Sequence, residues 1–329
     1  MGTPVFALPA FEALVNDPDS RFDVCLVLSK PDALAGRGLK PKASVISLAA
    51  RTAGIELWQP ASIGGTNQQI LLSRINELEI DFTVVTAYGL LLTEELIAAP
   101  RFGTVNIHAS LLPRWRGAAP IERAILAGDL QTGISIQRVR RKPDSGPVYA
   151  SASTTIDNKP ASELAFELAV IGSQLLVDCL PQIAQAKLIP VEQDENLVTY
   201  ADKLAANDLY LDPLMTVADN LRRVQAANNY TPARAIIADH GVKVQKALVA
   251  NLSDQLILQK SHLSIPSLST SQVLFINHRL FLQAVDGWFE VLELIPDGKR
   301  KMSGSAFADG LPELREINLP NLICWSRWG

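Results

Sequence analysis

Asn106 and His108 carry an amide that donates hydrogen bonds and an imidazole that exchanges protons near neutral pH. They lie two residues apart at the end of a predicted strand over residues 104–108, so their side chains share one face. In an open parallel sheet, ligands bind beyond the carboxyl ends of the strands. The spacing therefore predicts a place where both side chains meet a substrate.

Asp144 is a third candidate, in the motif Asp144-Ser145-Gly146 after a predicted strand over residues 132–139. A predicted helix over residues 120–127 connects the two strands, so they could be neighbours and bring Asp144 near His108. Either motif alone is weak evidence, because most Asn-x-His pairs satisfy a loop and most Asp-Ser-Gly motifs are simple turns. The intervening Arg114-Trp115-Arg116 cannot all be buried cheaply, so we expect that loop to face solvent or a polar partner.

Strand-like and helix-like segments alternate over the first two-thirds of the chain. Predicted strands cover residues 23–28, 81–87, 104–108 and 132–139, and predicted helices cover residues 43–53, 67–78, 120–127 and 161–180. This alternation predicts an α/β domain with a mostly parallel sheet covered by helices on both faces. After one predicted helix at 217–227, short alternating segments at 242–249, 273–277, 280–285 and 288–294 predict a small antiparallel barrel.

The composition is that of a globular protein with two domains: 329 residues, 48% hydrophobic and 19% charged. Charge and Pro or Gly break the apolar runs before they reach the roughly 20 residues of a membrane span, and the start lacks a signal-peptide pattern. We therefore expect a cytoplasmic protein that meets no membrane. The three cysteines lie far apart, at Cys25, Cys179 and Cys324, so their spacing is not that of a disulfide framework or a metal site. The four histidines also lack the spacing of metal ligands.

The net charge of −4 does not by itself suggest a nucleic-acid partner, so any such contact must come from local clusters. One cluster holds Lys30, Arg37, Lys40 and Lys42 against Asp32, a local balance of +4 − 1 = +3, with Arg37 between two glycines. A second cluster is Lys299-Arg300-Lys301. Such clusters are more often solvated surface than binding sites.

The set Asn106-x-His108, Ser110-Leu111-Leu112-Pro113 and Asp144 resembles the 10-formyltetrahydrofolate-dependent formyltransferases. The string Ser-Leu-Leu-Pro-Arg-Trp-Arg-Gly-Ala-Ala-Pro-Ile from residue 110 is similar to the methionyl-tRNA formyltransferase family. Other matching segments are Gly2-Thr3-Pro4, Phe6-Ala7, Pro31-Asp32, Gly36-Arg37-Gly38, Ala87-Tyr88-Gly89, Gln193-Asp194-Glu195, Val198-Thr199-Tyr200-Ala201, Gly298-Lys299 and Met302-Ser303. The resemblance spans nearly the whole chain.

This resemblance implies transfer of the formyl group of 10-formyltetrahydrofolate to the α-amino group of methionyl initiator tRNA, without a metal. It assigns proton transfer to His108, hydrogen bonding of the developing oxyanion to Asn106, and orientation of His108 to Asp144, directly or through a water. Folate would be bound by Ser110, Leu111, Leu112 and Pro113, with Tyr88 and Gly89 near it. The tRNA would be contacted by Arg37, Lys40, Lys42, Lys299, Arg300 and Lys301.

The implied domains are a Rossmann-like formyltransferase domain over residues 1–187, a connector over 188–208, and a C-terminal, OB-like antiparallel β-barrel domain over 209–329 that contacts tRNA. We expect a monomer. The family normally begins with a strand before Gly2, so we expect a central strand to be missing from this sequence. The basic run Arg138 to Lys142 replaces an acidic, glycine-containing run of the family, and we expect it to favour ionised Asp144 and to attract folate or phosphates.

Three alternatives are a hydrolase of the same fold that releases formate from the same folate, an enzyme that formylates a nucleotide sugar, and a non-catalytic tRNA-binding protein. The string from Arg114 to Ile121 and the barrel-like C-terminal domain argue against the first two. The presence of Asn106, His108 and Asp144 argues against the third, which would not need them.

Overall fold

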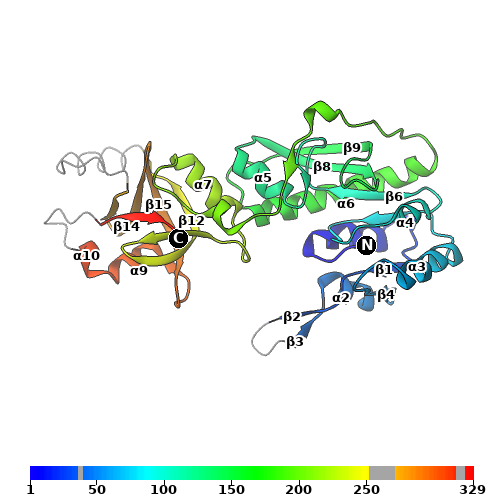
Figure 1. Cartoon of the computed structure of the whole chain (residues 1–329), viewed down its shortest axis with the longest axis horizontal. Helices are drawn as coiled ribbons and strands as arrows, with labels where there is room; N and C mark the ends of the chain where they lie inside the picture. The colour runs from blue at the N-terminus through cyan, green and yellow to red at the C-terminus, as the bar shows by residue number, and fades with distance from the viewer. Residues whose placement is uncertain (36–39, 252–270, 316–322) are drawn as a thin grey trace. The chain divides into compact units, whose positions relative to one another are not determined.

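The structure is a computed structural model that describes residues 1–35, 40–251, 271–315 and 323–329 (Figure 1). Its contacts divide the chain into two compact units. Unit 1 contains Met1–Ile121, Leu130–Asp157 and Glu163–Asp202, and unit 2 contains Glu122–Asp129, Asn158–Ser162 and Lys203–Gly329. The predicted domain boundaries after residues 187 and 208 stay predictions.

Unit 1 contains a two-stranded parallel sheet and a four-stranded mixed sheet. β1 (Leu26–Leu28) runs parallel to β4 (Glu56–Trp58), and β5 (Thr83–Val85) runs parallel to β6 (Thr104–His108). β8 (Gln131–Arg138) pairs antiparallel with both β6 and β9 (Val148–Thr155). The α/β class is confirmed, and β6 and β8 are neighbours as the crossover predicts, although β8 and β9 depart from the parallel arrangement.

The helices of unit 1 follow the sequence pattern closely. They are η1 (Val5–Ala7), α1 (Leu8–Val15), α2 (Val45–Thr52), α3 (Thr66–Glu77), α4 (Glu94–Ala98), α5 (Pro120–Ala127, shared with unit 2), α6 (Ala161–Ala184) and η2 (Glu195–Leu197). Ser44 caps α2 by accepting a hydrogen bond from the backbone of Ser47, and Thr93 caps α4 in the same way from Leu96. The predicted helices at 43–53, 67–78 and 120–127 are therefore confirmed.

α6 is a 24-residue helix that is long and apolar enough to cross a membrane by length and composition. One such helix is weak evidence, because the core helix of a soluble protein passes the same test. Leu164, Leu168 and Leu176 of α6 are fully buried, and half of its most apolar stretch lies inside the protein.

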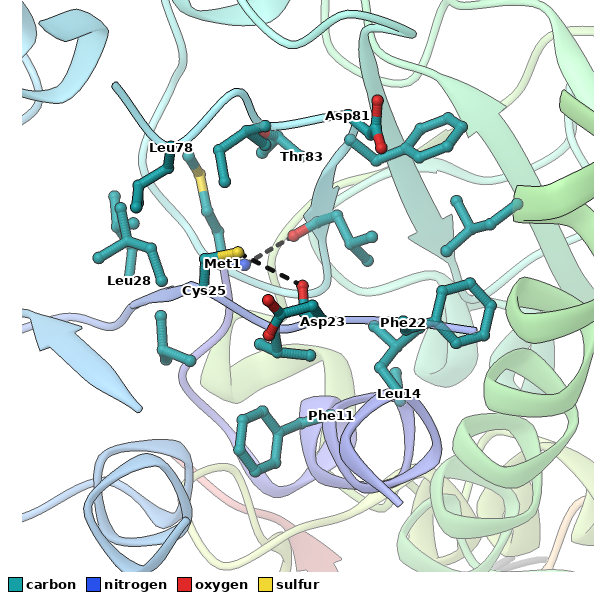
Figure 2. Close-up of a pocket in the computed structure, with 18 of the residues that line it drawn as sticks. Met1, Phe11, Leu14, Phe22, Asp23, Cys25, Leu28, Leu78, Asp81 and Thr83 are labelled. Atoms are coloured by element: carbon teal, nitrogen blue, oxygen red, sulfur yellow. Dashed lines mark hydrogen bonds between the residues drawn. The ribbon is translucent and has the colours of Figure 1, made fainter. Parts of the chain in front are cut away.

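Met1 and Gly2 lie between β1 and β5. The amino group of Met1 donates to the carbonyl of Val84 at 2.6 Å, and Gly2 donates to Leu28 at 3.0 Å. Figure 2 shows Met1 at the wall of a cavity of about 710 Å³ that is lined mainly by apolar side chains. No predicted site residue that the structure describes lines this cavity.

Unit 2 contains a curled antiparallel sheet. Its strands lie in the order β13 (Val273–Ile276), β14 (Arg279–Ala284), β15 (Gly287–Pro296), β12 (His240–Val249), β11 (Ala233–Ile237) and β17 (Trp325–Arg327), with β16 (Met302–Ser303) paired to β15. Val242, Val244, Phe289 and Leu294 fill its core. The helices are η3 (Ala206–Leu209), α7 (Val217–Ala226), α9 (Gly304–Asp309) and α10 (Pro312–Arg315). The expected OB-like antiparallel fold is confirmed.

Candidate active site

β6 presents Asn106 and His108 from the same face. β6 pairs with β8 so that Asn106 lies opposite Gln137 and His108 lies opposite Ser135. Asn106 is half-buried, and its carboxamide has no hydrogen-bond partner among the residues that the structure describes. His108 is only 5% exposed. The strand thus carries an amide that is available for hydrogen bonding and, two residues later, a buried imidazole.

Asp144 lies next to His108. The distance from Nδ1 of His108 to Oδ1 of Asp144 is 3.4 Å. The carboxylate is anchored on both oxygens, because the backbone N–H of Gly117 donates to Oδ2 at 2.9 Å and the amide of Gln137 donates to Oδ1 at 2.9 Å. The structure therefore brings together the three predicted catalytic residues, while their roles stay predictions.

The other ring nitrogen of His108 also faces an acceptor. Nε2 of His108 lies 2.9 Å from the carbonyl oxygen of Trp115. Because both ring nitrogens face oxygen acceptors, the neutral imidazole can donate to only one of them, whereas the protonated imidazole can donate to both. In this conformation the loop around Trp115 covers Nε2, so a substrate amine that approaches Nε2 must displace the Trp115 carbonyl.

The predicted folate residues 110–113 form the loop after β6. Ser110 is fully buried, and its hydroxyl donates to the carbonyl of Arg114 at 2.6 Å. This hydrogen bond connects the two ends of the loop and stabilises its conformation. Ser135 ties the same loop to β8, because its hydroxyl accepts from the backbone of Leu112 at 3.0 Å. Leu111, Leu112 and Pro113 are half-buried and offer an apolar surface beside His108.

Tyr88 and Gly89 follow β5. Tyr88 packs in an apolar cluster with Leu28, Leu71 and Leu96, and burial raises the pKa of its hydroxyl to about 12. That hydroxyl is buried without a partner in the described part of the chain. Gly89 has a φ of 74°, and a Cβ there would lie 2.6 Å from Nζ of Lys30. Any contact of Tyr88 with folate would therefore come from this turn rather than from the phenol.

The loop expected to face solvent or a polar partner does both, because Arg114 is exposed and Arg116 is buried against polar side chains. Arg114 is exposed, but Arg116 is only 1% exposed. Its guanidinium donates to Oε1 of Glu195 at 2.8 Å and to Oε1 of Gln193 at 2.9 Å. These partners offset the cost of removing the charge from water. The sequence alone did not identify Gln193, Glu195 or Gln137 as part of the site, although residues 193–195 belong to a segment of the family resemblance.

The basic run after β8 is largely neutralised by carboxylates. Arg140 contacts Glu192 at 2.6 Å, Arg141 contacts Glu94 at 3.7 Å, and Lys142 contacts Glu195 at 3.9 Å. Arg138 donates to the hydroxyl of Tyr149. These charges are thus less available to folate or phosphates than the sequence suggests, and their effect on Asp144 stays a prediction.

The predicted tRNA contacts are only partly described. Arg37 and the side chain of Lys40 lie outside the described residues, next to the antiparallel pair β2 (Ala33–Ala35) and β3 (Lys40–Lys42) in the sequence. Lys42 is exposed. Lys299, Arg300 and Lys301 are exposed after β15, where Lys301 pairs with Glu293 at 2.6 Å. A role of either cluster in tRNA binding stays a prediction.

Residues 4–180 match the sequence profile of a family described as formyl transferase. A methionyl-tRNA formyltransferase of Methylococcus capsulatus is 37% identical over 307 residues, which are 93% of this chain and 94% of that relative. A methionyl-tRNA formyltransferase of Novosphingobium aromaticivorans is 43% identical over 233 residues, 71% of this chain and 74% of that relative.

Two solved structures share the fold across most of the chain. WlaRD, a sugar 3N-formyl transferase crystallised in the presence of dTDP and 5-N-formyl-THF, has a TM-score of 0.62 at 14% identity and covers 91% of this chain and 97% of its own. An N-formyltransferase of Helicobacter canadensis has a TM-score of 0.59 at 13% identity and covers 88% of this chain and 96% of its own. At these identities the similarity establishes the fold alone.

Proposed function

This chain belongs to the methionyl-tRNA formyltransferase family, and we propose that Asn106, His108 and Asp144 are the residues that catalyse its reaction. The enzyme transfers the formyl group of 10-formyltetrahydrofolate to the α-amino group of methionyl initiator tRNA. The observation that carries the assignment is the 3.4 Å approach of His108 Nδ1 to Asp144 Oδ1 at the end of β6, beside the open amide of Asn106.

The chemistry calls for one proton acceptor and one hydrogen-bond donor. A free α-amine titrates near ~7.7, and the ester of methionyl-tRNA lowers this value, so the amine reacts in its neutral form at physiological pH. As the amine attacks the formyl carbon, His108 takes its proton and Asn106 donates to the formyl oxygen, which gains negative charge. Asp144 stabilises the protonated imidazole, which gives the proton to N10 of folate as the bond between N10 and the formyl carbon breaks, so that tetrahydrofolate leaves.

Folate and tRNA would meet at this edge of the sheet. The half-buried apolar side chains of Leu111, Leu112 and Pro113 suit a flat heteroaromatic ring beside His108. Ser110 holds their loop, and the turn at Tyr88 and Gly89 lies after the neighbouring strand β5. The basic segment with Arg37, Lys40 and Lys42 would guide the acceptor end of the tRNA, and Lys299, Arg300 and Lys301 of unit 2 would also contact the tRNA.

We also propose that the enzyme works as a monomer in the cytoplasm and does not contact a membrane. The burial of one side of α6 within the protein supports a core helix rather than a membrane span. Sedimentation of the purified chain and fractionation of cells test these two points. A membrane-bound fraction or a stable dimer would contradict them.

The test of the catalytic assignment is His108→Ala. Loss of a positioned acid–base group is expected to lower the rate of transfer by roughly 10²- to 10⁴-fold while folate still binds. The matched control is His278→Ala, because His278 also faces an aspartate, Asp309 at 3.8 Å, but on the exposed surface of unit 2. Near-native turnover of His108→Ala in a single-turnover assay would contradict the assignment.

A further inference from the structure

Gln193 joins two loops of the site, although its sequence position predicts a connector between domains. Its Nε2 donates to the backbone carbonyls of Asp144 at 2.8 Å and Gly146 at 2.7 Å. Its Oε1 accepts from Nε of Arg116 at 2.9 Å. One carboxamide thus links the turn that carries Asp144 to the loop that covers His108.

Arg116 fixes the direction of this carboxamide. The guanidinium can only donate, so Oε1 of Gln193 must face it and Nε2 must face Asp144. Arg116 itself cannot turn freely, because Glu195 pairs with both of its terminal nitrogens and its backbone N–H donates to Thr199 at 2.9 Å. The segment from Gln193 to Thr199 therefore holds Gln193 in one orientation.

The turn at Asp144 needs such a holder. Asp144 has a φ of 53°, in the left-handed region that few non-glycine residues adopt. Its carboxylate must stay near Nδ1 of His108, and hydrogen bonds from Gly117 and Gln137 fix the side chain. Those two donors set where the carboxylate points, whereas Gln193 is the side chain that holds the backbone carbonyls of the same turn.

We propose that Gln193 is a positioning residue for formyl transfer: by holding the Asp144 turn against Arg116, it keeps the carboxylate at His108. This inference rests on the proposed catalytic role of Asp144. Gln193 acts through Asp144 and touches neither substrate. A shift of the turn by a fraction of an ångström lengthens the contact between Oδ1 and Nδ1, which weakens stabilisation of the protonated imidazole.

Two substitutions separate the halves of the carboxamide. Gln193→Leu removes both donor and acceptor, whereas Gln193→Glu keeps an acceptor for Arg116 and removes the donor to Asp144. Both variants are expected to lower kcat by about 10- to 100-fold with little change in KM for folate or tRNA, because misplacement of a catalytic group by about 1 Å costs rate on this scale. Glu192→Gln is the control, since Glu192 is adjacent but pairs with Arg140 at the surface.

A double-mutant cycle decides whether Gln193 acts through Asp144. In an Asp144→Asn background, the further change to Gln193→Leu or Gln193→Glu is expected to lower single-turnover rates by less than about 2-fold, because coupled residues are not additive. Equal losses in both backgrounds, or near-native kcat in both single variants, would overturn the positioning role. If Gln193→Leu has a much lower melting temperature than the native chain, the comparison uses Gln193→Glu instead. Native-like turnover of Asp144→Asn would instead contradict the proposed catalytic role of Asp144, and the inference would fall with it.

Discussion

At the scale of residues, the site combines one strongly anchored carboxylate with one open amide. Asp144 receives hydrogen bonds from Gly117 and Gln137, so its position is set before any substrate arrives. Asn106 has no side-chain partner among the described residues, so its amide donor is available to a ligand. Catalysis by hydrogen bonding to a developing charge depends on such a donor being in place without reorganisation.

Asn106→Ala tests the donor. Removal of one hydrogen bond to a developing oxyanion costs about 10²- to 10³-fold in kcat. We expect that loss with nearly unchanged binding of both substrates, because the bond strengthens only as charge develops. Asn76→Ala is the control, since Asn76 is exposed on α3. A variant that lost affinity rather than kcat would mean that Asn106 binds the ground state.

The sequence predicted Asn106, His108 and Asp144 chiefly through the family resemblance, because the local motif around each residue is weak evidence alone. It did not predict Gln137, whose role depends on its pairing opposite Asn106 in an antiparallel register. Nor did it predict Gln193, which contacts Arg116 and Asp144 because the segment after α6 packs within unit 1. The sequence predicted solvent or a polar partner for the loop of Arg116 but not which partner, since Glu195 is distant in sequence.

At the scale of elements, the short pair of β7 (Arg116–Gly117) and β10 (Tyr200–Ala201) closes the site loop. The backbone N–H groups of Ala118 and Ala119 both donate to the carbonyl of Ala201. This pairing places Gly117 where its own N–H reaches Asp144. A two-residue strand pair therefore helps to place a donor to the carboxylate of Asp144.

Gly117→Ala is expected to disturb this pair. Gly117 has a φ of 126°, and a Cβ there would lie 2.7 Å from the carbonyl oxygen of Ala201. Strain of this kind costs on the order of 1–3 kcal/mol, so we expect a lower melting temperature and a lower kcat. Gly64→Ala is the control, because a Cβ at Gly64 meets nothing within 4 Å. Native activity in Gly117→Ala would show that the pair tolerates displacement.

Glu122 on α5 is expected to make the stability of the protein depend on pH. Burial raises the pKa of its carboxyl above the ordinary value of 4.5, although Asn228 and Arg123 oppose the shift. The folded state thus holds this proton to higher pH than the unfolded state, so the free energy of unfolding falls as pH rises above that value. Glu122→Gln should remove this decline. Denaturant unfolding at about pH 4 and about pH 7 gives the free energy of unfolding of the native chain and of Glu122→Gln. An equal decline in both proteins would contradict a contribution from Glu122.

At the scale of the whole molecule, the chain has a net charge of −4 yet acts on a polyanion. Attraction to tRNA must therefore come from local clusters rather than from overall charge. The carboxylates around Arg140, Arg141 and Lys142 offset the basic run beside the site. The clusters that contain Arg37 and Lys299 are our candidates for phosphate contacts.

Arg37→Ala is expected to lower kcat/KM for methionyl-tRNA and to leave folate affinity unchanged. If Arg37 contacts a phosphate, the slope of log affinity against log salt should fall by about 1, because one fewer counterion is released. Arg101→Ala is the control, since Arg101 is 75% exposed near Asp81. An unchanged slope with unchanged kinetics would mean that the Arg37 loop is ordinary solvated surface.

The most direct test of the central claim follows the formyl carbon. The purified chain is given 10-formyltetrahydrofolate labelled in the formyl group, with charged initiator tRNA, uncharged tRNA or no tRNA. We predict label on the methionyl amine of charged tRNA alone, recovered as N-formylmethionine, and loss of that product in His108→Ala. Release of labelled formate at the same rate without tRNA would contradict the account and identify a hydrolase.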